Sequence, residues 1–388
     1  MSWEPMQKAE ALIVGGGPAG AALGIALARR GRAVTLLEQC ATAHDKVCGE
    51  FLSHEAVGYL ESLGLSPRSL GAVVIHAVRL HGRRVIAKCE LPFPALSLTR
   101  RALDEALLAL AADEGVTVHR GKRVEALTRA SNGWQARVSG GVVHGGRTAF
   151  LATGKHDVNG YRRPAGRQNN LVGFKMYFRL ADVQTQSLNG WVELFLFRGG
   201  YAGLQMVEGG QANLCLVVTR EQLARCNGTW GALLEHLREA SRPLAERLEG
   251  AAPLLAKPLA ISSIPYGLLP WNAQDGLWRL GDQAAVIPSF SGDGMSMALH
   301  SGLLAAEMYE RGRSAAEFAL AMRMQFQNSV RLATAISRVM VQAPMAAQVA
   351  RLWPGLLGRI AARTRVPAAS LLTATAGLRQ SKTELRAG

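Results

Sequence analysis

The feature that most constrains this chain is a glycine-rich turn between an apolar run and a helical segment near its N-terminus. Residues 11–14 form an apolar run typical of a buried strand, and three glycines follow at the spacing G-x-G-x-x-G, at Gly15, Gly17 and Gly20. Residues 21–30 are rich in Ala and Leu and predict a helix. The order strand, glycine turn, helix indicates the start of an α/β unit.

The residues after this helix add a second strand and an acid. Residues 33–37 form another apolar run, which Glu38 closes. In such a unit Gly15 permits the tight turn, Gly17 lets the backbone approach a pyrophosphate, and Gly20 lets the helix pack close to the strand. The helix N-terminus offers free N–H groups to the phosphates, and an acid at the end of the second strand accepts hydrogen bonds from a ribose. The pattern predicts a dinucleotide site; a glycine-rich turn without a ligand is the alternative.

Two distant segments contain similar arrangements of acids, glycines and helix starts. Residues 279–304 read RLGDQAAVIPSFSGDGMSMALHSGLL, in which a strand-like start ends at Asp282 and Gly292 and Gly294 precede a helix. Residues 96–127 place Arg100 four residues before an Asp at the start of a predicted helix, with a strand after it.

Together these segments resemble the FAD-binding proteins of the glutathione reductase and aromatic hydroxylase type, whose first motif also reads GGGPAG. The resemblance implies that Asp282 holds a ribityl hydroxyl of FAD and that Gly292 and Gly294 lie against the flavin ring. The helix that starts near Met295 would direct its positive end at the ring, where reduced flavin is anionic. The residues that the resemblance assigns to FAD are Gly15, Gly17, Pro18, Ala19, Gly20, Glu38, Cys48, Gly49, Arg100, Val124, Ala152, Gly154, Gly281, Asp282, Gly292, Gly294 and Met295.

The order of these segments predicts a discontinuous domain organisation. We expect an α/β fold with a Rossmann-like FAD-binding domain of the glutathione reductase type, formed by residues 1–65, 95–168 and 271–310. Residues 66–94 and 169–270 contain strand-like runs and predict an inserted substrate domain with one antiparallel sheet. Residues 311–388 predict a C-terminal helical region.

The predicted substrate sheet is unusually apolar. Seven of its apolar residues could form either the walls of a pocket or the core of the domain. The core is favoured, because one face of a sheet normally packs against other elements. The seven residues are Phe174, Met176, Phe178, Phe195, Phe197, Leu204 and Met206. Such a sheet fits a hydrophobic or aromatic substrate better than a sugar or an amino acid.

Several motifs bear on the reaction within this superfamily. The stretches PSFSGDGMSMALHSG (288–302) and KVCGEFLS (46–53) are similar to those of geranylgeranyl reductases, but the aromatic-Trp-Pro signature of those enzymes is missing. The Asp-Gly motif of hydroxylases is replaced by Thr153-Gly154, and the WxWxIP motif of halogenases is absent.

We therefore rank a monooxygenase that uses oxygen and NAD(P)H-reduced FAD slightly ahead of a geranylgeranyl reductase-like reductase of C=C bonds. A flavin-dependent halogenase ranks lowest among the enzymes. A non-catalytic protein that uses the FAD fold to bind a lipid or a partner is the remaining alternative.

No residue stands out as the catalytic group, because the flavin performs the redox chemistry in this class. Lys46 and Lys175 are candidates by residue type alone, and Cys48 has either a chemical role near the flavin or a packing role. His44, His54 and His300 lie in or beside the cofactor segments, and the sequence does not distinguish among them.

Charge and cysteine content bear on partners and compartment. The net charge is +15, and residues 311–388 contain twelve Arg and Lys residues against two acids. We expect no nucleic acid partner; the basic region is either a solvated surface or a contact for anionic lipid or an acidic carrier protein. Five unpatterned cysteines argue against a disulfide framework or a zinc site. With no signal peptide or membrane span, we expect a cytoplasmic protein, with peripheral membrane contact as an option.

Overall fold

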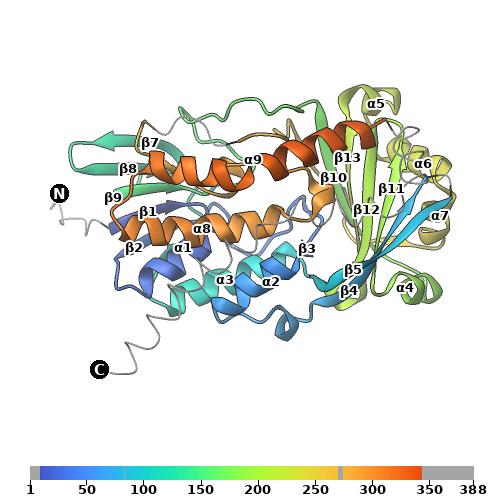
Figure 1. Cartoon of the computed structure of the whole chain (residues 1–388), viewed down its shortest axis with the longest axis horizontal. Coiled ribbons are helices and arrows are strands. Elements are labelled where there is room, and N and C mark those ends of the chain that lie inside the picture. Colours follow the sequence, from blue (N-terminus) through green and yellow to red (C-terminus); the bar gives the residue numbers. More distant parts are fainter. Residues whose placement is uncertain (1–8, 83, 270–273, 343–388) are drawn as a thin grey trace.

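Two β-sheets lie one after the other along the long axis of the molecule, with helices packed on both (Figure 1). The computed structural model describes residues 9–82, 84–269 and 274–342. The first sheet contains the N-terminal glycine turn, and the second sheet lies at the other end of the molecule.

The first sheet has a parallel half and an antiparallel half. Its strands in spatial order are β6 (Thr117–His119), β2 (Val34–Leu37), β1 (Ala9–Val14), β9 (Val143–Leu151), β8 (Gly133–Val138) and β7 (Val124–Ala130), and β16 (Trp278–Arg279) pairs with β9. The pairs β6–β2, β2–β1, β1–β9 and β9–β16 are parallel, whereas β7, β8 and β9 form an antiparallel meander. Central parallel strands are buried on both sides, which explains why β1 and β2 read as continuous apolar runs.

A layer of helices covers one face of this sheet (Figure 1). They are α1 (Pro18–Ala28), α2 (His54–Ser62), α3 (Arg100–Asp113), α8 (Gly294–Glu310) and α9 (Ala315–Met340). Residues of α1 are buried on all sides because the helix is enclosed between β1, α3 and α8. A Cβ atom on Gly302 of α8 would lie 2.4 Å from the backbone oxygen of Ala19, so the close approach of α1 and α8 depends on that glycine.

The second sheet is antiparallel except for one parallel pair, β4–β11. Its strands in spatial order are β14 (Ala252–Pro253), β10 (Leu171–Arg179), β13 (Gln211–Thr219), β12 (Gly200–Val207), β11 (Trp191–Phe197), β4 (Val73–His81), β5 (Val85–Ser97) and β3 (Phe51–Leu52), and β15 (Leu259–Ser262) pairs with β10. Both segments predicted to form a substrate sheet thus join in one sheet. The predicted fold class, an FAD-type α/β domain with an inserted, mainly antiparallel sheet, is confirmed.

The outer face of the second sheet carries short helices and a separate core. The helices are α4 (Asp182–Leu188), α5 (Arg220–Arg225), α6 (Trp230–Ala240) and α7 (Arg242–Arg247). All seven apolar residues weighed between pocket and core pack into this core, together with Leu233 and Leu237 of α6. The interpretation as core is confirmed, and the interpretation as pocket wall is wrong. Side chains alternate along a strand, so Lys175 and Tyr177, rather than Phe174 and Met176, face the first sheet.

The C-terminal helix α9 returns to the first sheet. Phe318 of α9 packs on Trp278 of β16, with ring centroids 5.2 Å apart. The predicted domain limits stay predictions, and residues 343–388 of the predicted C-terminal helical region lie outside the described residues. In the part of the chain that the structure describes, no helix is long and apolar enough to cross a membrane.

Candidate cofactor site

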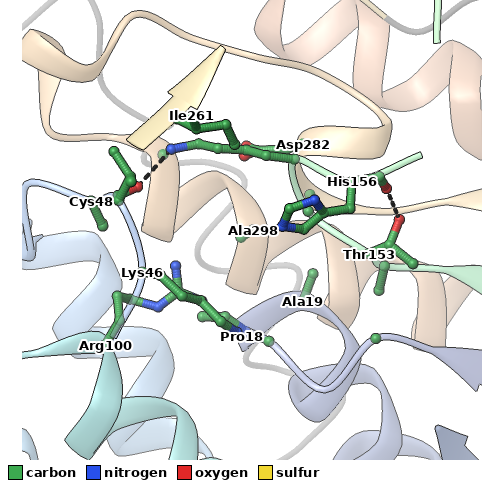
Figure 2. A pocket seen from close by; sticks show the side chains of 18 of the residues that line it. Pro18, Ala19, Lys46, Cys48, Arg100, Thr153, His156, Ile261, Asp282 and Ala298 are labelled. Atoms are coloured by element: carbon green, nitrogen blue, oxygen red, sulfur yellow. Dashed lines mark hydrogen bonds between the residues drawn. The ribbon is translucent and has the colours of Figure 1, made fainter. Parts of the chain in front are cut away.

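A cavity of about 520 Å³ lies where the two sheets meet. Its volume is in the range of small-molecule and cofactor sites. The cavity is lined by the turn after β1, the end of β2, the segment before β3, the start of α3, the loop after β9, strand β15 and the segment from Leu280 to Ala298. Figure 2 shows side chains of Lys46 and Arg100 on one side of this space, opposite Asp282 and Ile261.

All of the residues predicted to bind FAD, except Gly20, line this cavity. Three segments that are far apart in sequence, at Gly15, Arg100 and Asp282, therefore meet at one site. Gly20 has a packing role instead: a Cβ atom there would lie 2.0 Å from the backbone oxygen of Gly15. This is the helix–strand contact that the third glycine of such a motif permits. The binding of FAD by these residues stays a prediction.

The turn after β1 provides the features that a diphosphate requires. Gly15 has φ +108°, and a Cβ atom there would lie 2.4 Å from the backbone oxygen of Ala152. Helix α1 starts at Pro18, and no side chain caps its N-terminus, so its first N–H groups stay available to an anion. The turn is held in shape by Glu38, which accepts hydrogen bonds from the N–H groups of Gly16 (2.8 Å) and Cys40 (2.9 Å).

Two cations share one carboxylate beside the turn. Arg100 donates two hydrogen bonds of 2.8 Å to Asp104, and the Lys46 ammonium lies 2.8 Å from the same carboxylate. Burial alone lowers the pKa of Arg100, but its ion pair with Asp104 raises that pKa above the usual value. Burial likewise raises the pKa of Asp104, and the two cations bring it below its ordinary value. The group stays charged, with a net positive charge facing a cavity suited to phosphate.

Asp282 lies on the opposite side of the cavity (Figure 2). It belongs to a short 3-10 helix, η3 (Gly281–Gln283), and Gly281 at its start has φ +55°. The backbone oxygen of Asp282 accepts a hydrogen bond from Arg163 (2.9 Å), while the side chain of Gln283 donates to the backbone oxygens of Gly154 (2.8 Å) and His156. These bonds fix the backbone and leave the Asp282 carboxylate without a hydrogen bond to the described residues.

The end of the cavity nearest the second sheet contains the glycines assigned to the flavin ring. Gly292 follows the 3-10 helix η4 (Ser289–Ser291) with φ +75°, and a Cβ atom there would lie 2.6 Å from the ring of Phe51. Helix α8 starts at Gly294 without a side-chain cap, so its positive end faces the cavity.

A trio of hydroxyl groups, which sequence reasoning missed, lies at this end. Ser289 lines the cavity and is exposed to it. The Tyr266 hydroxyl donates to Ser289 Oγ (2.9 Å), and the Tyr201 hydroxyl lies 3.2 Å from the same atom. Burial raises the pKa of both tyrosines, so they stay protonated at neutral pH. If both donate, the Ser289 hydroxyl keeps its own proton for a ligand in the cavity. No sequence signal brings these three residues together, because they come from β12, from the loop between β15 and β16, and from η4.

Lys155 and His156 are two further lining residues that sequence reasoning missed. The Lys155 ammonium donates to the backbone oxygen of Val47 (2.7 Å). His156 lies next to Thr153 in Figure 2, and burial lowers the pKa of this histidine. Both residues come directly after Gly154, so the assignment of Ala152 and Gly154 to FAD was the signal that could have identified them.

The residues weighed for catalysis divide into two groups. Cys48, Lys46 and His44 line the cavity. His300 does not: it is fully buried between α2 and α9, where it bonds Tyr59 (2.8 Å) and Gln325.

His54 and Lys175 also lie outside the lining. His54 stacks on Phe93 with ring centroids 4.9 Å apart. Lys175 is fully buried and forms an ion pair with Glu50, which itself lines the cavity.

One group of potential metal ligands occurs among the described residues: Glu38, Cys40 and His44, whose ligand atoms lie within 4.8 Å of one another. Both Glu38 oxygens already accept backbone hydrogen bonds, and Cys40 Sγ lies 3.3 Å from His44. The position of Glu38 at the end of β2 suits a ribose.

The donor set along the cavity fits FAD. An uncapped helix N-terminus and a cationic pair suit the diphosphate, the carboxylates of Glu38 and Asp282 suit the hydroxyls of the two sugar-like parts, and a second helix N-terminus suits the ring.

Comparison with known proteins agrees with this arrangement. Residues 8–150 match the family model described as an FAD binding domain. The chain is 26% identical over 328 residues to a menaquinone reductase of Mycolicibacterium smegmatis, an alignment that covers 79% of this chain and 77% of that protein. A shorter match, 31% identical over 124 residues, covers 31% of this chain and 20% of a squalene monooxygenase of Mus musculus.

Solved structures show the same fold at lower identity. The flavin-dependent brominase Bmp2 superposes with a TM-score of 0.76 at 18% identity, covering 98% of this chain and 99% of that one. PqsL, described as a probable FAD-dependent monooxygenase from Pseudomonas aeruginosa, superposes with a TM-score of 0.69 at 20% identity and covers 88% and 99%. A geranylgeranyl bacteriochlorophyll reductase-like protein from Thermoplasma acidophilum gives 0.69 at 18% identity, covering 98% and 99%.

Proposed function

We propose that this FAD-dependent oxidoreductase is a monooxygenase of a hydrophobic small molecule. The observation that carries this proposal is the single cavity in which the predicted FAD segments meet an apolar wall. Once reduced by NAD(P)H, bound FAD would supply the two electrons of the reaction.

The wall of the cavity suggests the kind of substrate. Ile261 of β15 and Val286 and Ile287 of the loop before η4 line it next to the segment assigned to the flavin ring. Ser289 provides one hydroxyl in this otherwise apolar surface. An apolar ligand with an oxygen substituent would bury its hydrocarbon part against the isoleucines and accept a hydrogen bond from Ser289.

A second reaction, reduction of a C=C bond, is favoured by one specific observation. Sequence matches that cover more than three quarters of both chains are to menaquinone reductases. The match to a squalene monooxygenase covers a smaller part of the chain and supports the first reaction. Both relatives are named for hydrophobic isoprenoid compounds, which agrees with the apolar wall.

Product analysis separates the two reactions. Purified protein loaded with FAD is reduced under anaerobic conditions with NADH or NADPH and then offered alkyl quinones and squalene, with and without oxygen. We expect a product that has gained one oxygen atom, formed only when oxygen is admitted. A product that has gained two hydrogens without oxygen would replace this proposal by the reductase.

Two further outcomes would identify the remaining alternatives. A product formed only when bromide or chloride is added would indicate a halogenase. A protein that takes up no FAD would indicate a binding role. Contact with anionic lipid or an acidic carrier protein, and a cytoplasmic location, stay predictions, since most of the basic C-terminal charge lies outside the described residues.

A further inference from the structure

A fully buried carboxylate lies in the cavity wall beside Cys48. Glu50 is 0% exposed and has φ +60°, a conformation that non-glycine residues adopt at a cost of about 1 kcal/mol or more. Its backbone oxygen accepts hydrogen bonds from the N–H of Leu98 (3.2 Å) and the hydroxyl of Ser97 (3.3 Å), which hold this conformation. Strained residues concentrate at functional sites, so the position of Glu50 needs an explanation beyond packing.

The two oxygens of this carboxylate have different surroundings. Oε1 accepts hydrogen bonds from the N–H of Arg100 (2.8 Å) and the hydroxyl of Tyr177 (2.8 Å), and it forms the ion pair with Lys175. Oε2 has no hydrogen-bond partner among the described residues, although it is buried. A buried polar atom without a partner costs free energy, and here it belongs to a residue that lines the cavity. Oε2 is therefore the oxygen of this carboxyl group that no described residue engages, and the one on which a proton would be carried.

A chain of hydrogen bonds leads from Glu50 toward solvent. The Lys175 ammonium donates to Tyr177 Oη (2.7 Å), and Tyr177 donates to Glu50. Tyr177 Oη also lies 3.5 Å from Oδ1 of Asp45, whose side chain is 18% exposed and lines the cavity. A tyrosine hydroxyl both donates and accepts, so a proton can pass between Asp45 and Glu50 through it.

The ionisable groups around Glu50 favour proton exchange at its carboxyl. Burial raises the pKa of Glu50 despite the opposing effect of Lys175 on β10. Burial raises the pKa of Tyr177, and the nearby acids Glu50, Asp45 and Glu208 raise it further. The Tyr177 hydroxyl therefore stays protonated. The Arg100 guanidinium on α3 pairs with Asp104, so Arg100 reaches this carboxyl through its backbone N–H alone. Two thiols lie close by: Cys48 Sγ accepts from the N–H of Glu50, and Cys215 lies on β13, where burial raises its pKa to about 12.

We propose that Glu50 supplies the proton that the reaction at the flavin consumes, that Tyr177 passes a proton back to it from Asp45, and that Lys175 is a positioning residue that holds Tyr177 and Glu50 in place. The inference rests on the proposed function but applies to either of its two reactions. Anionic reduced FAD carries two electrons and one hydrogen, so each reaction requires one more proton.

The proton balance is the same in both cases. In C=C reduction the π bond breaks, one carbon takes a hydride equivalent from reduced FAD and the other takes the Glu50 proton, and FAD is left oxidised. In oxygenation one atom of O₂ enters a C–O bond, and the other leaves as water with the hydrogen of reduced FAD and the Glu50 proton. Glu50 is left as a carboxylate, and a proton from water at Asp45 returns to it through Tyr177.

The experiment compares the holoenzyme with Glu50→Gln, Tyr177→Phe and a matched control, Glu193→Gln. Glu193 is also a fully buried acid, held by Arg79 (2.8 Å) and Arg247 (3.0 Å), but it lies outside the cavity lining. The first readout needs no substrate: the infrared difference spectrum between oxidised and photoreduced holoenzyme. We expect a carboxylic acid band that changes on reduction, disappears in Glu50→Gln, shifts in Tyr177→Phe and is unaltered in Glu193→Gln.

The second readout is the rate of product formation from reduced enzyme. We expect a loss of about 100-fold or more in Glu50→Gln and about tenfold in Tyr177→Phe, with the rate of FAD reduction by NAD(P)H unchanged. A carboxyl region identical in wild type and Glu50→Gln, or a rate within about twofold of wild type, would overturn the proposal.

The two readouts also separate failure of this inference from failure of the proposed function. If the wild-type protein converts no substrate, the proposed function fails, whereas the infrared comparison still decides the role of Glu50. If Glu50→Gln does not fold, Tyr177→Phe keeps the carboxyl and provides the test: an unshifted band would overturn the relay.

Discussion

At the scale of single residues, the site combines groups that the protein holds tightly with groups that it leaves unbonded. Arg100, Asp104 and Lys46 neutralise one another in part and keep a fixed positive charge at the cavity. Asp282 and Glu50 Oε2 have carboxylate oxygens without hydrogen-bond partners among the described residues. Glu50 Oε2 is buried, so its missing partner costs stability, whereas the half-buried Asp282 carboxylate is open to a ligand in the cavity.

Replacement of Asp282 tests the assignment to FAD. In Asp282→Asn a neutral amide replaces the carboxylate, so the hydrogen bond to a ribityl hydroxyl loses its charge. We expect FAD affinity, measured by titration of the apoprotein with FAD, to fall by about 10- to 100-fold. The urea unfolding of the apoprotein should stay unchanged, because the carboxylate bonds no described side chain. Unaltered affinity would place the ribityl arm elsewhere.

At the scale of elements, the packing of α1 between β1 and α8 sets the geometry of the glycine turn. The contact depends on small residues on both helices, and Gly302 approaches the backbone of Ala19 too closely for a Cβ atom. The same interface positions Pro18 and Ala19 at the cavity and carries Gly281 against α8. Crowding there would therefore disturb both the fold and the site.

Two glycine replacements in helices should have opposite effects. We expect Gly302→Ala to lower the free energy of unfolding by about 1–3 kcal/mol, because its Cβ atom would overlap the backbone of α1. Gly58 in α2 has no atom within 4 Å of such a Cβ, so Gly58→Ala should raise the free energy of unfolding by about 0.5–1 kcal/mol. Urea unfolding of the apoproteins measures both. Equal effects at the two positions would contradict the packing argument.

At the scale of the whole molecule, the site depends on contacts between the two sheets and between helices that lie far apart in the sequence. The cavity takes its walls from both sheets, and His300 joins α2, α8 and α9 behind it. Both ring nitrogens of His300 are engaged: Nε2 donates to the side-chain oxygen of Gln325, and Nδ1 lies 2.8 Å from the Tyr59 hydroxyl. Burial favours the neutral imidazole, in which Nδ1 accepts from Tyr59.

The stability of the molecule should depend on pH through His300. Burial lowers its pKa in the folded protein from the usual 6.5 to about 4. As the pH falls below about 6.5, His300 binds a proton in the unfolded chain but not in the folded protein. The contribution of neutral His300 to the free energy of unfolding is therefore fully present above that pH and is lost as the pH falls toward 4. Between pH 7 and pH 5 we expect wild type to lose about 2 kcal/mol more than His300→Gln in urea unfolding. Parallel losses in the two proteins would contradict this.

The sequence by itself determined the local features of the cofactor site. The glycine turn, the acid after the second strand and the helix starts near Pro18 and Gly294 depend on backbone conformation over a few residues, and the fold class follows from their order. The positions of Gly15, Arg100 and Asp282 on one cavity also agree with the predicted cofactor segments.

Only the tertiary structure decided which face of the substrate sheet meets the cofactor segments. Alternation along β10 separates Phe174 from Lys175 but does not say which of them faces outward, because that depends on where α6 and α7 pack. The trio around Ser289 and the contacts of Glu50 join strands, loops and a helix that lie far apart in the chain. Local patterns contain no information about such contacts, since they form only when the two sheets are brought together.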